Sequence, residues 1–309
     1  MRLDDFDYEL PAERIAQTPI EPRDAARLLV DRGSRPPEHR RVRDLPEILR
    51  SGDLVVVNET KVIPARLPLR RTTGGAAEVL MLEPLDGERR TWEALVRPAR
   101  KLRVGEILVA ADGTPAIEVG ERRPAGDTFT VSVVGSVASL DLLAEHGEMP
   151  LPPYITERLA EPDRYQTVYA RDPGSAAAPT AGLHFTPELL ARLDDAGVER
   201  EAVELVVGLD TFRPVTEADP TAHRMHTERY RVPAATIERC RAVRDTGGRV
   251  VAVGTTSVRA LESAAMTGEL TGRTDIFIHD PYDWQLVDVM MTNFHLPKTT
   301  LLMLSLIHI

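Results

Sequence analysis

The sequence predicts an α/β fold: a barrel-like α/β domain with a small all-β barrel inserted into it. In residues 1–66 and 137–309, apolar strand-like runs alternate with helix-like segments, the order typical of parallel strands with helical crossovers. Residues 67–136 instead contain short strand-like runs separated by glycine-containing turns and no convincing helix, which indicates a small barrel or sandwich. We therefore expect a discontinuous α/β domain, 1–66 and 137–309, and an inserted β-barrel domain, 67–136.

The individual elements follow from apolar runs and helix-start signals. Thr186 and Pro187 suit the N-cap and the first helical position, so a helix is expected over 186–196. The run Leu-Val-Val-Val at 54–57 suits a strand covered on both faces. The other elements expected in the α/β part are short helices at 11–16 and 44–49, strands at 26–30, 200–207, 249–253 and 275–278, and helices at 140–146, 234–245 and 258–265. The strands expected in the insertion are 77–82, 91–96, 106–109, 116–119 and 128–133.

Composition and charge narrow the class of protein. The chain has 309 residues with 42% hydrophobic and 28% charged residues, as in ordinary globular proteins. It has no apolar run near the ~20 residues needed to span a bilayer, and its acidic N-terminus lacks a signal peptide's apolar core. The single cysteine, Cys240, excludes an intrachain disulfide and a multi-cysteine zinc site. We expect a cytoplasmic monomer that does not bind membranes.

The net charge of −10 gives the chain no overall basic field for attracting nucleic acid. The acidic net charge makes nucleic-acid binding less expected. It does not exclude such binding, because local arginine clusters can still bind phosphates.

The sharpest strand-to-helix junction is Gly254, Thr255, Thr256 and Ser257, followed by Arg259. Open amides, three hydroxyls and a guanidinium make a good site for a carboxylate or a phosphate. Ligands of parallel α/β folds usually bind at such carboxyl ends of strands. The alternative is plain N-capping of the helix, which needs only one of the three hydroxyls.

Two further polar stretches are candidate binding or acid/base sites. The stretch APTAGLHFT at 178–186 places His184 just before a helix start. It is either a core histidine in a tight turn or a residue near the free amides that attract anions. The loop at 292–300 holds Asn293, His295 and Lys298 between apolar residues, and so many donors on one loop favour function.

A polar stretch at 58–66, with Lys61 and Arg66, also follows an apolar strand. Near Arg213, the residues His226 and Glu228 alternate on an extended chain and could form an acid/base pair, although such residues on an exposed strand are more often solvated. His223 and His226 match no zinc motif, so we expect no metal.

Seven ordered motifs together resemble the S-adenosylmethionine:tRNA ribosyltransferase-isomerase family of queuosine biosynthesis, from end to end of the chain. The motifs are FDYELPAERIAQTPIEPRDAARLLV at 6–30, GDLVVVNETKVIPARL at 52–67, YQTVYARDPGSAAAPTAGLHFT at 165–186, VGLDTFRPV at 207–215, MHTERY at 225–230, VAVGTTSVRALES at 251–263 and TNFHLPKTTLLML at 292–304.

The resemblance implies an activity and two partners. Members of this family transfer and isomerise the ribosyl group of S-adenosylmethionine onto 7-aminomethyl-7-deazaguanine in tRNA anticodons. The product is epoxyqueuosine, and adenine and methionine are released. The implied partners are S-adenosylmethionine as co-substrate and tRNA carrying the modified base, and the implied fold is a barrel-like α/β catalytic domain with an inserted β-barrel.

The implied chemistry suggests roles for the candidate residues. A proton must leave the ribose carbon beside the sulfonium, and the tRNA aminomethyl group must be neutral to attack, so a base working near neutral pH is needed. His184 or His295 would supply it, with the 254–257 turn holding the methionine carboxylate. The full set of candidates is His184, His295, His226 and Glu228 for catalysis; Thr180, Gly182, Gly254, Thr255, Thr256, Ser257 and Asn293 for S-adenosylmethionine; and Lys61, Arg66, Arg213, Arg259 and Lys298 for tRNA phosphate or that carboxylate.

Two departures from the family pattern leave other interpretations open. Asp210 stands where the family has a glycine, and the pattern continues past Leu304 whereas this chain stops at Ile309, which we interpret as C-terminal truncation. The alternative is then a catalytically impaired tRNA-binding homologue. A third interpretation is an unrelated α/β enzyme that binds a phosphorylated small molecule at 254–257.

Overall fold

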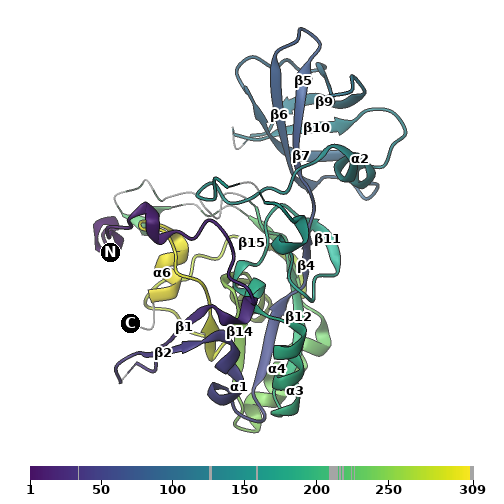
Figure 1. The fold of residues 1–309 in the computed structure, drawn as a ribbon. Coiled ribbons are helices and arrows are strands. Elements are labelled where there is room, and N and C mark those ends of the chain that lie inside the picture. Colours follow the sequence, from purple (N-terminus) through teal and green to yellow (C-terminus); the bar gives the residue numbers. More distant parts are fainter. Residues whose placement is uncertain are drawn as a thin grey trace. The chain divides into compact units, whose positions relative to one another are not determined.

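A computed structural model describes residues 1–33, 35–124, 127–157, 159–208, 215, 217, 219–223, 225 and 227–306. The chain divides into two compact units (Figure 1). Unit 1 comprises Met1–Thr60, Pro153–Asp172 and Ala178–Ile309, and unit 2 comprises Lys61–Pro152 and Pro173–Ala177. The expected insertion, 67–136, falls within unit 2. The expected α/β class with an all-β barrel is confirmed.

Unit 2 is built on a closed antiparallel barrel with the strand order β10-β7-β6-β5-β8-β9. Alternate side chains fill its interior: β7 buries Trp92, Ala94 and Val96 and exposes the residues between them to a greater degree. The barrel strands are β5 Arg66–Arg71, β6 Ala76–Pro84, β7 Thr91–Arg97, β8 Ile107–Val109, β9 Pro115–Arg122 and β10 Phe129–Val133, and the helix α2 is Ser139–His146.

Unit 1 is built on a six-stranded sheet with the order β15-β13-β12-β3-β14-β16. The four strands from β12 to β16 run parallel, and β13 and β15 pair antiparallel at the other edge. The expectation of parallel strands with helical crossovers is thus confirmed for the centre of the sheet. The strands are β3 Leu54–Asn58, β12 Glu199–Leu205, β13 Glu228–Arg231, β14 Val250–Val253, β15 Thr271–Thr274 and β16 Val289–Met291.

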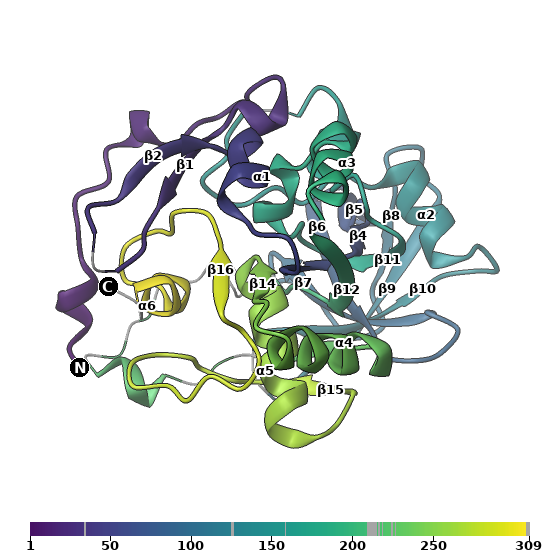
Figure 2. The same ribbon diagram turned by 90° about the horizontal axis from the view of Figure 1, so that it is seen from below.

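Both faces of the sheet's centre are covered by helices, and Figure 2 shows α1 and α3 on one side and α4 and α5 on the other. Val55 and Val57 of β3 pack with Leu189 and Leu193 of α3 in one buried cluster. Because neighbouring strand residues point to opposite faces, the equally buried Leu54 and Val56 face the other layer. This explains the unbroken apolar run at 54–57. The helices are α1 Leu45–Ile48, α3 Pro187–Asp195, α4 Ala234–Asp245 and α5 Thr255–Thr267.

The remaining elements are short. They are the hairpin β1 Arg27–Val30 and β2 Glu38–Arg41, the two-stranded sheet β4 Thr60–Val62 and β11 Asp172–Ser175, the helix α6 Thr300–Leu306, and 3-10 turns at Leu3–Phe6, Ala12–Arg14, Arg23–Ala25, Val42–Asp44, Pro162–Tyr165, Thr180–His184 and Pro220–Ala222. Within the described residues, no helix is both long enough and apolar enough to cross a bilayer.

Two expected elements are corrected by the structure. The strand expected at 275–278 lies instead at Thr271–Thr274, because this polar segment pairs with β13 and places Gly272 opposite Tyr230. The helix expected at 258–265 already begins at Thr255, directly after the glycine that ends β14.

Asp53 ties together the beginnings of the neighbouring strands β3 and β14. Its carboxylate is buried and accepts hydrogen bonds from the Arg50 amide (2.8 Å) and from the Arg249 amide (3.2 Å) and guanidinium (2.5 and 3.1 Å). Although burial alone raises the pKa of Asp53, the hydrogen bonds from Arg249 and Arg50 hold it below the usual value.

We expect Asp53→Asn to lower the free energy of unfolding by about 1.5–3 kcal/mol at neutral pH, because charge-assisted hydrogen bonds are lost. The pKa of Asp53 is lower in the folded state than in the unfolded state. The carboxylate's contribution to stability is therefore complete above the unfolded-state pKa and disappears as the pH falls through the folded-state pKa. Urea denaturation of both proteins at neutral and acidic pH measures this. The exposed Asp245→Asn is the control and should change stability by less than about 0.5 kcal/mol. If the two proteins differed in stability at acidic pH as much as at neutral pH, the charge of Asp53 would not be what stabilises the fold.

Candidate functional site

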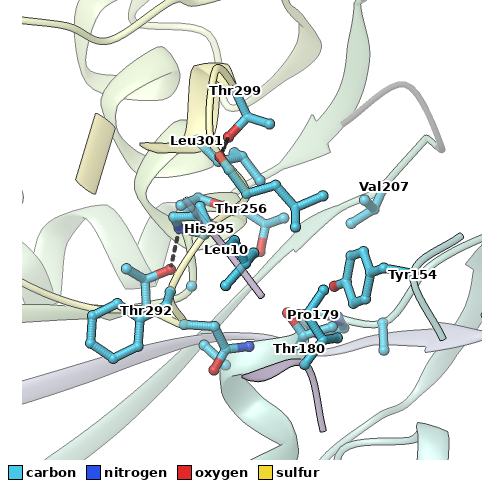
Figure 3. Close-up of a pocket in the computed structure, with 18 of the residues that line it drawn as sticks. Leu10, Tyr154, Pro179, Thr180, Val207, Thr256, Thr292, His295, Thr299 and Leu301 are labelled. Atoms are coloured by element: carbon cyan, nitrogen blue, oxygen red, sulfur yellow. Dashed lines mark hydrogen bonds between the residues drawn. The ribbon is translucent and has the colours of Figure 1, made fainter. Parts of the chain in front are cut away.

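A cavity of about 200 Å³ lies in unit 1, at the carboxyl ends of β14 and β16 (Figure 3). Its wall combines the start of α5, the loop after β16, the turn before α3 and the N-terminal segment. The residues that line it are Tyr8, Leu10, Arg14, Ile15, Tyr154, Ala178, Pro179, Thr180, Ala181, Val207, Gly254, Thr255, Thr256, Thr292, Asn293, Phe294, His295, Leu296, Thr299 and Leu301. Five of the expected S-adenosylmethionine residues and one expected catalytic histidine are therefore brought together.

The start of α5 forms the floor of this cavity. Gly254 has φ +86°, a conformation that favours glycine and lets the chain turn from β14 straight into the helix. Thr255 and Thr256 follow and line the cavity, and the buried Thr256 hydroxyl has no hydrogen-bond partner within the described structure. Ser257 does not line the cavity, because its side chain is fully buried and donates to the Val253 carbonyl (2.7 Å).

Gly182 also lies outside the cavity lining, although it was expected to bind the co-substrate. A side chain there would come within 2.0 Å of the hydroxyl oxygen of Tyr169, and this oxygen is buried. The absence of a side chain at Gly182 therefore serves packing beneath the 3-10 turn Thr180–His184.

The two histidines expected as bases occupy different environments. His184 is half-buried and its Nε2 lies 2.9 Å from Oδ1 of Asn293, so His184 adjoins the cavity through a residue that lines it. His295 lines the cavity itself, and its Nε2 lies 3.2 Å from the Thr292 hydroxyl. Burial lowers the pKa of His295 to about 4, so its ring is neutral at physiological pH.

Glu228 of β13 and Arg259 of α5 form a buried ion pair. Glu228 also accepts a hydrogen bond from the Gly208 amide (3.2 Å), and Arg259 lies 3.5 Å from the Thr274 carbonyl oxygen. Glu228 is thus not solvated on an exposed strand, and the Arg259 guanidinium is committed to it rather than presented to solvent. Separating the pair would leave an uncompensated buried charge, which is costly. We therefore assign to this pair a structural role, which is to hold α5 against β13 and β15.

The other expected phosphate-binding cations are dispersed. Lys298 forms ion pairs with Asp7 (2.9 Å) and Asp4 (3.5 Å) of the N-terminal segment. Lys61 is exposed in unit 2, where Arg66 pairs with Glu78 at 3.4 Å. Arg213, His226 and Asp210 lie outside the described residues.

Sequence reasoning missed the contribution of the N-terminal segment. Tyr8, Leu10, Arg14 and Ile15 all line the cavity. They are held there by the Tyr8 hydroxyl, which donates to the His295 carbonyl, and by the Lys298 amide, which donates to the Phe6 carbonyl. Arg14 is the one cationic side chain among the described residues of the lining. The only signal in the sequence was the family motif at 6–30, which carries no chemical role by itself.

Glu59, Asp172 and Glu204 lie close enough together to offer three oxygen ligands to a cation. Arg171 pairs with Glu59 at 3.5 Å, and Arg231 pairs with both Asp172 and Glu204. Each of the three carboxylates thus already pairs with one of two guanidinium groups, so we assign no metal to the group.

Comparisons with known proteins give a consistent result. The family model described as "Queuosine biosynthesis protein" matches residues 3–306. S-adenosylmethionine:tRNA ribosyltransferase-isomerase from Symbiobacterium thermophilum is 56% identical, and its counterpart from Moorella thermoacetica is 51% identical; each match covers 98% of this chain and 90% of the relative. The crystal structure of S-adenosylmethionine tRNA ribosyltransferase from Thermotoga maritima covers 97% of this chain and 88% of its own, with 37% sequence identity and a TM-score of 0.51.

We expect the ring of His295 to titrate with a midpoint near pH 4, well below the ordinary value of about 6.5, because its environment disfavours the charged form. Titration of the histidine ring protons by NMR measures this, with the His295→Asn spectrum identifying the signal. The pKa of His295 is lower in the folded state than in the unfolded state. The stability that the neutral ring contributes is therefore complete above the unfolded-state pKa and declines as the pH falls toward the folded-state pKa. A midpoint near 6.5 would show that the ring is solvated.

Proposed function

Because the chain belongs to the queuosine biosynthesis protein family, we propose that it is an S-adenosylmethionine:tRNA ribosyltransferase-isomerase. It transfers and isomerises the ribosyl group of S-adenosylmethionine onto 7-aminomethyl-7-deazaguanine in tRNA anticodons, which gives epoxyqueuosine and releases adenine and methionine. The observation that carries the proposal is the 56% identity to a relative of that name along almost the whole chain. Because the chain belongs to this family, the interpretation as an unrelated α/β enzyme is rejected. Nothing in the described residues favours a catalytically impaired homologue.

The methionine carboxylate binds at the start of α5. The amide groups there carry the positive end of the helix dipole, and the buried Thr256 hydroxyl, which has no partner among the described residues, can donate to an anion. Arg14 adds a positive charge to the same lining. A cavity of about 200 Å³ is smaller than the ~300–1,000 Å³ typical of small-molecule pockets, so the ligand extends to the rim.

His184 is the base that we favour. Its contact with the Asn293 oxygen is made by the protonated Nε2, so Nδ1 is the nitrogen that can accept a proton. A base is most effective when its pKa lies near the working pH, and the pKa of about 4 for His295 makes that ring a weak base. Asn293 then positions His184, and His295 is a neutral part of the wall.

We expect His184→Ala to reduce adenine release by about 10²–10⁴-fold, the usual contribution of a general base. The assay uses S-adenosylmethionine and tRNA carrying 7-aminomethyl-7-deazaguanine, with released adenine separated by chromatography. His295→Ala should retain more activity than His184→Ala, and circular dichroism establishes that each variant is folded. Undiminished turnover in His184→Ala would remove His184 as the base, whereas absence of release from the unaltered protein would contradict the proposed function.

We expect Thr256→Val to weaken S-adenosylmethionine binding by roughly 10- to 100-fold, because a hydrogen bond to a charged group contributes about 1.5–3 kcal/mol. The free protein should lose no stability, since that hydroxyl bonds to no group in the described part of the chain. Calorimetric titration gives the Kd, and Thr256→Ser should restore affinity by returning the hydroxyl. Equal affinity of the Val and Ser variants would place the carboxylate elsewhere.

A further inference from the structure

The cavity mouth carries an exposed aromatic ring. Phe294 is 88% exposed, the highest exposure among the large apolar side chains of the described structure. Of the aromatic residues in the described part of the chain, only Phe294 and Tyr8 are exposed, and both line this one cavity. Burying a phenylalanine ring contributes about 1.5–3 kcal/mol of free energy, which an exposed ring does not gain. An exposed ring at a binding site can gain it by contact with a ligand.

The loop that carries Phe294 is anchored on both sides of it. The preceding Asn293 contacts His184, and the following His295 contacts Thr292 through its ring and accepts the Tyr8 hydroxyl through its carbonyl. The chain around Phe294 is thus held by side-chain contacts while the ring itself projects outward. A ring presented by a fixed backbone is preorganised for contact with a partner, and little ordering is needed on binding.

A small ligand held inside the cavity does not account for this ring. Ligands of that size bury most of their surface against the walls, whereas Phe294 offers nearly all of its surface to the outside. Its partner therefore lies outside the enclosed part of the cavity and reaches the ring from solvent, as an RNA loop does; the rim portion of S-adenosylmethionine is the alternative that fluorescence distinguishes. With a net charge of −10, the chain has no general attraction for a polyanion, so contacts independent of charge gain importance in binding RNA.

We propose that Phe294 is a stacking platform for a nucleobase of the tRNA anticodon loop at the mouth of the site. Aromatic side chains bind unpaired bases through their π-faces. Enzymes that act on a base often take that base out of its stack, and an aromatic ring can then replace the lost neighbour. This inference rests on the proposed function and identifies how the acceptor, rather than S-adenosylmethionine, is held.

The first test is kinetic. Phe294→Ala should raise the KM for tRNA by about tenfold to a hundredfold, as removal of one base-stacking ring does, while the Kd for S-adenosylmethionine stays unchanged. Phe294→Tyr should keep the wild-type KM, and Phe294→Leu should behave as Phe294→Ala because it lacks a flat ring. The control Met266→Ala removes another exposed apolar side chain, at the far end of α5, and should change neither constant.

The second test measures the contact directly and does not depend on turnover. Tryptophan fluorescence of Phe294→Trp, corrected for Trp92 and Trp284 with the unaltered protein, should be quenched by tRNA carrying 7-aminomethyl-7-deazaguanine and not by S-adenosylmethionine alone. Quenching by S-adenosylmethionine would place its adenine on the ring and overturn the proposal. Absence of quenching by either ligand would overturn it too, while adenine release from the unaltered protein would leave the proposed function standing.

Discussion

The hydrogen bond from the Gly254 amide to the Met291 carbonyl (2.8 Å) is the constraint on which the site depends. It closes the parallel ladder between β14 and β16 at the carboxyl edge of the sheet. Parallel strands bring their following residues to the same edge, so the start of α5 and the loop with Asn293 and His295 become neighbours. Two segments nearly forty residues apart in the sequence thus form one wall of the cavity. The positive φ of Gly254 makes the turn into α5 abrupt enough for the helix amides to face that wall.

A second layer of polar groups supports this wall from behind. The Glu228–Arg259 pair joins α5 to the antiparallel edge of the sheet and also accepts the Gly208 amide. The Ser257 hydroxyl donates a hydrogen bond to the carbonyl of Val253, the last residue of β14. Burying a charge is costly unless it is paired, which is why the Arg259 guanidinium meets the Glu228 carboxylate. The carboxyl edge therefore needs polar residues for its own construction as well as for a ligand.

This double use explains which parts of the site the sequence could predict. Local signals were sufficient for α3 and α4 and for the buried run of β3, because capping residues and apolar periodicity act over a few residues. They also identified Gly254, Thr255 and Thr256, which follow an apolar strand. They could not separate Ser257 and Arg259 from these, since the Ser257 hydroxyl turns back to the Val253 carbonyl and Arg259 pairs with Glu228 on a strand distant in the sequence. The role of Tyr8 and Arg14 was equally hidden, because it arises from contacts with the loop at 292–299, at the opposite end of the chain.

The neutrality of His295 fits the charge of the ligand that we propose. S-adenosylmethionine carries a positive sulfonium, and Arg14 already contributes one positive charge to the described lining. A protonated imidazole on the same wall would repel the sulfonium, most strongly where water is excluded. Burial of His295 keeps that ring uncharged at physiological pH, so it contributes shape and a hydrogen bond without electrostatic cost. In the proposed reaction the proton-accepting role falls to His184, whose Nε2 contacts Asn293 and whose Nδ1 is the nitrogen left to accept the proton.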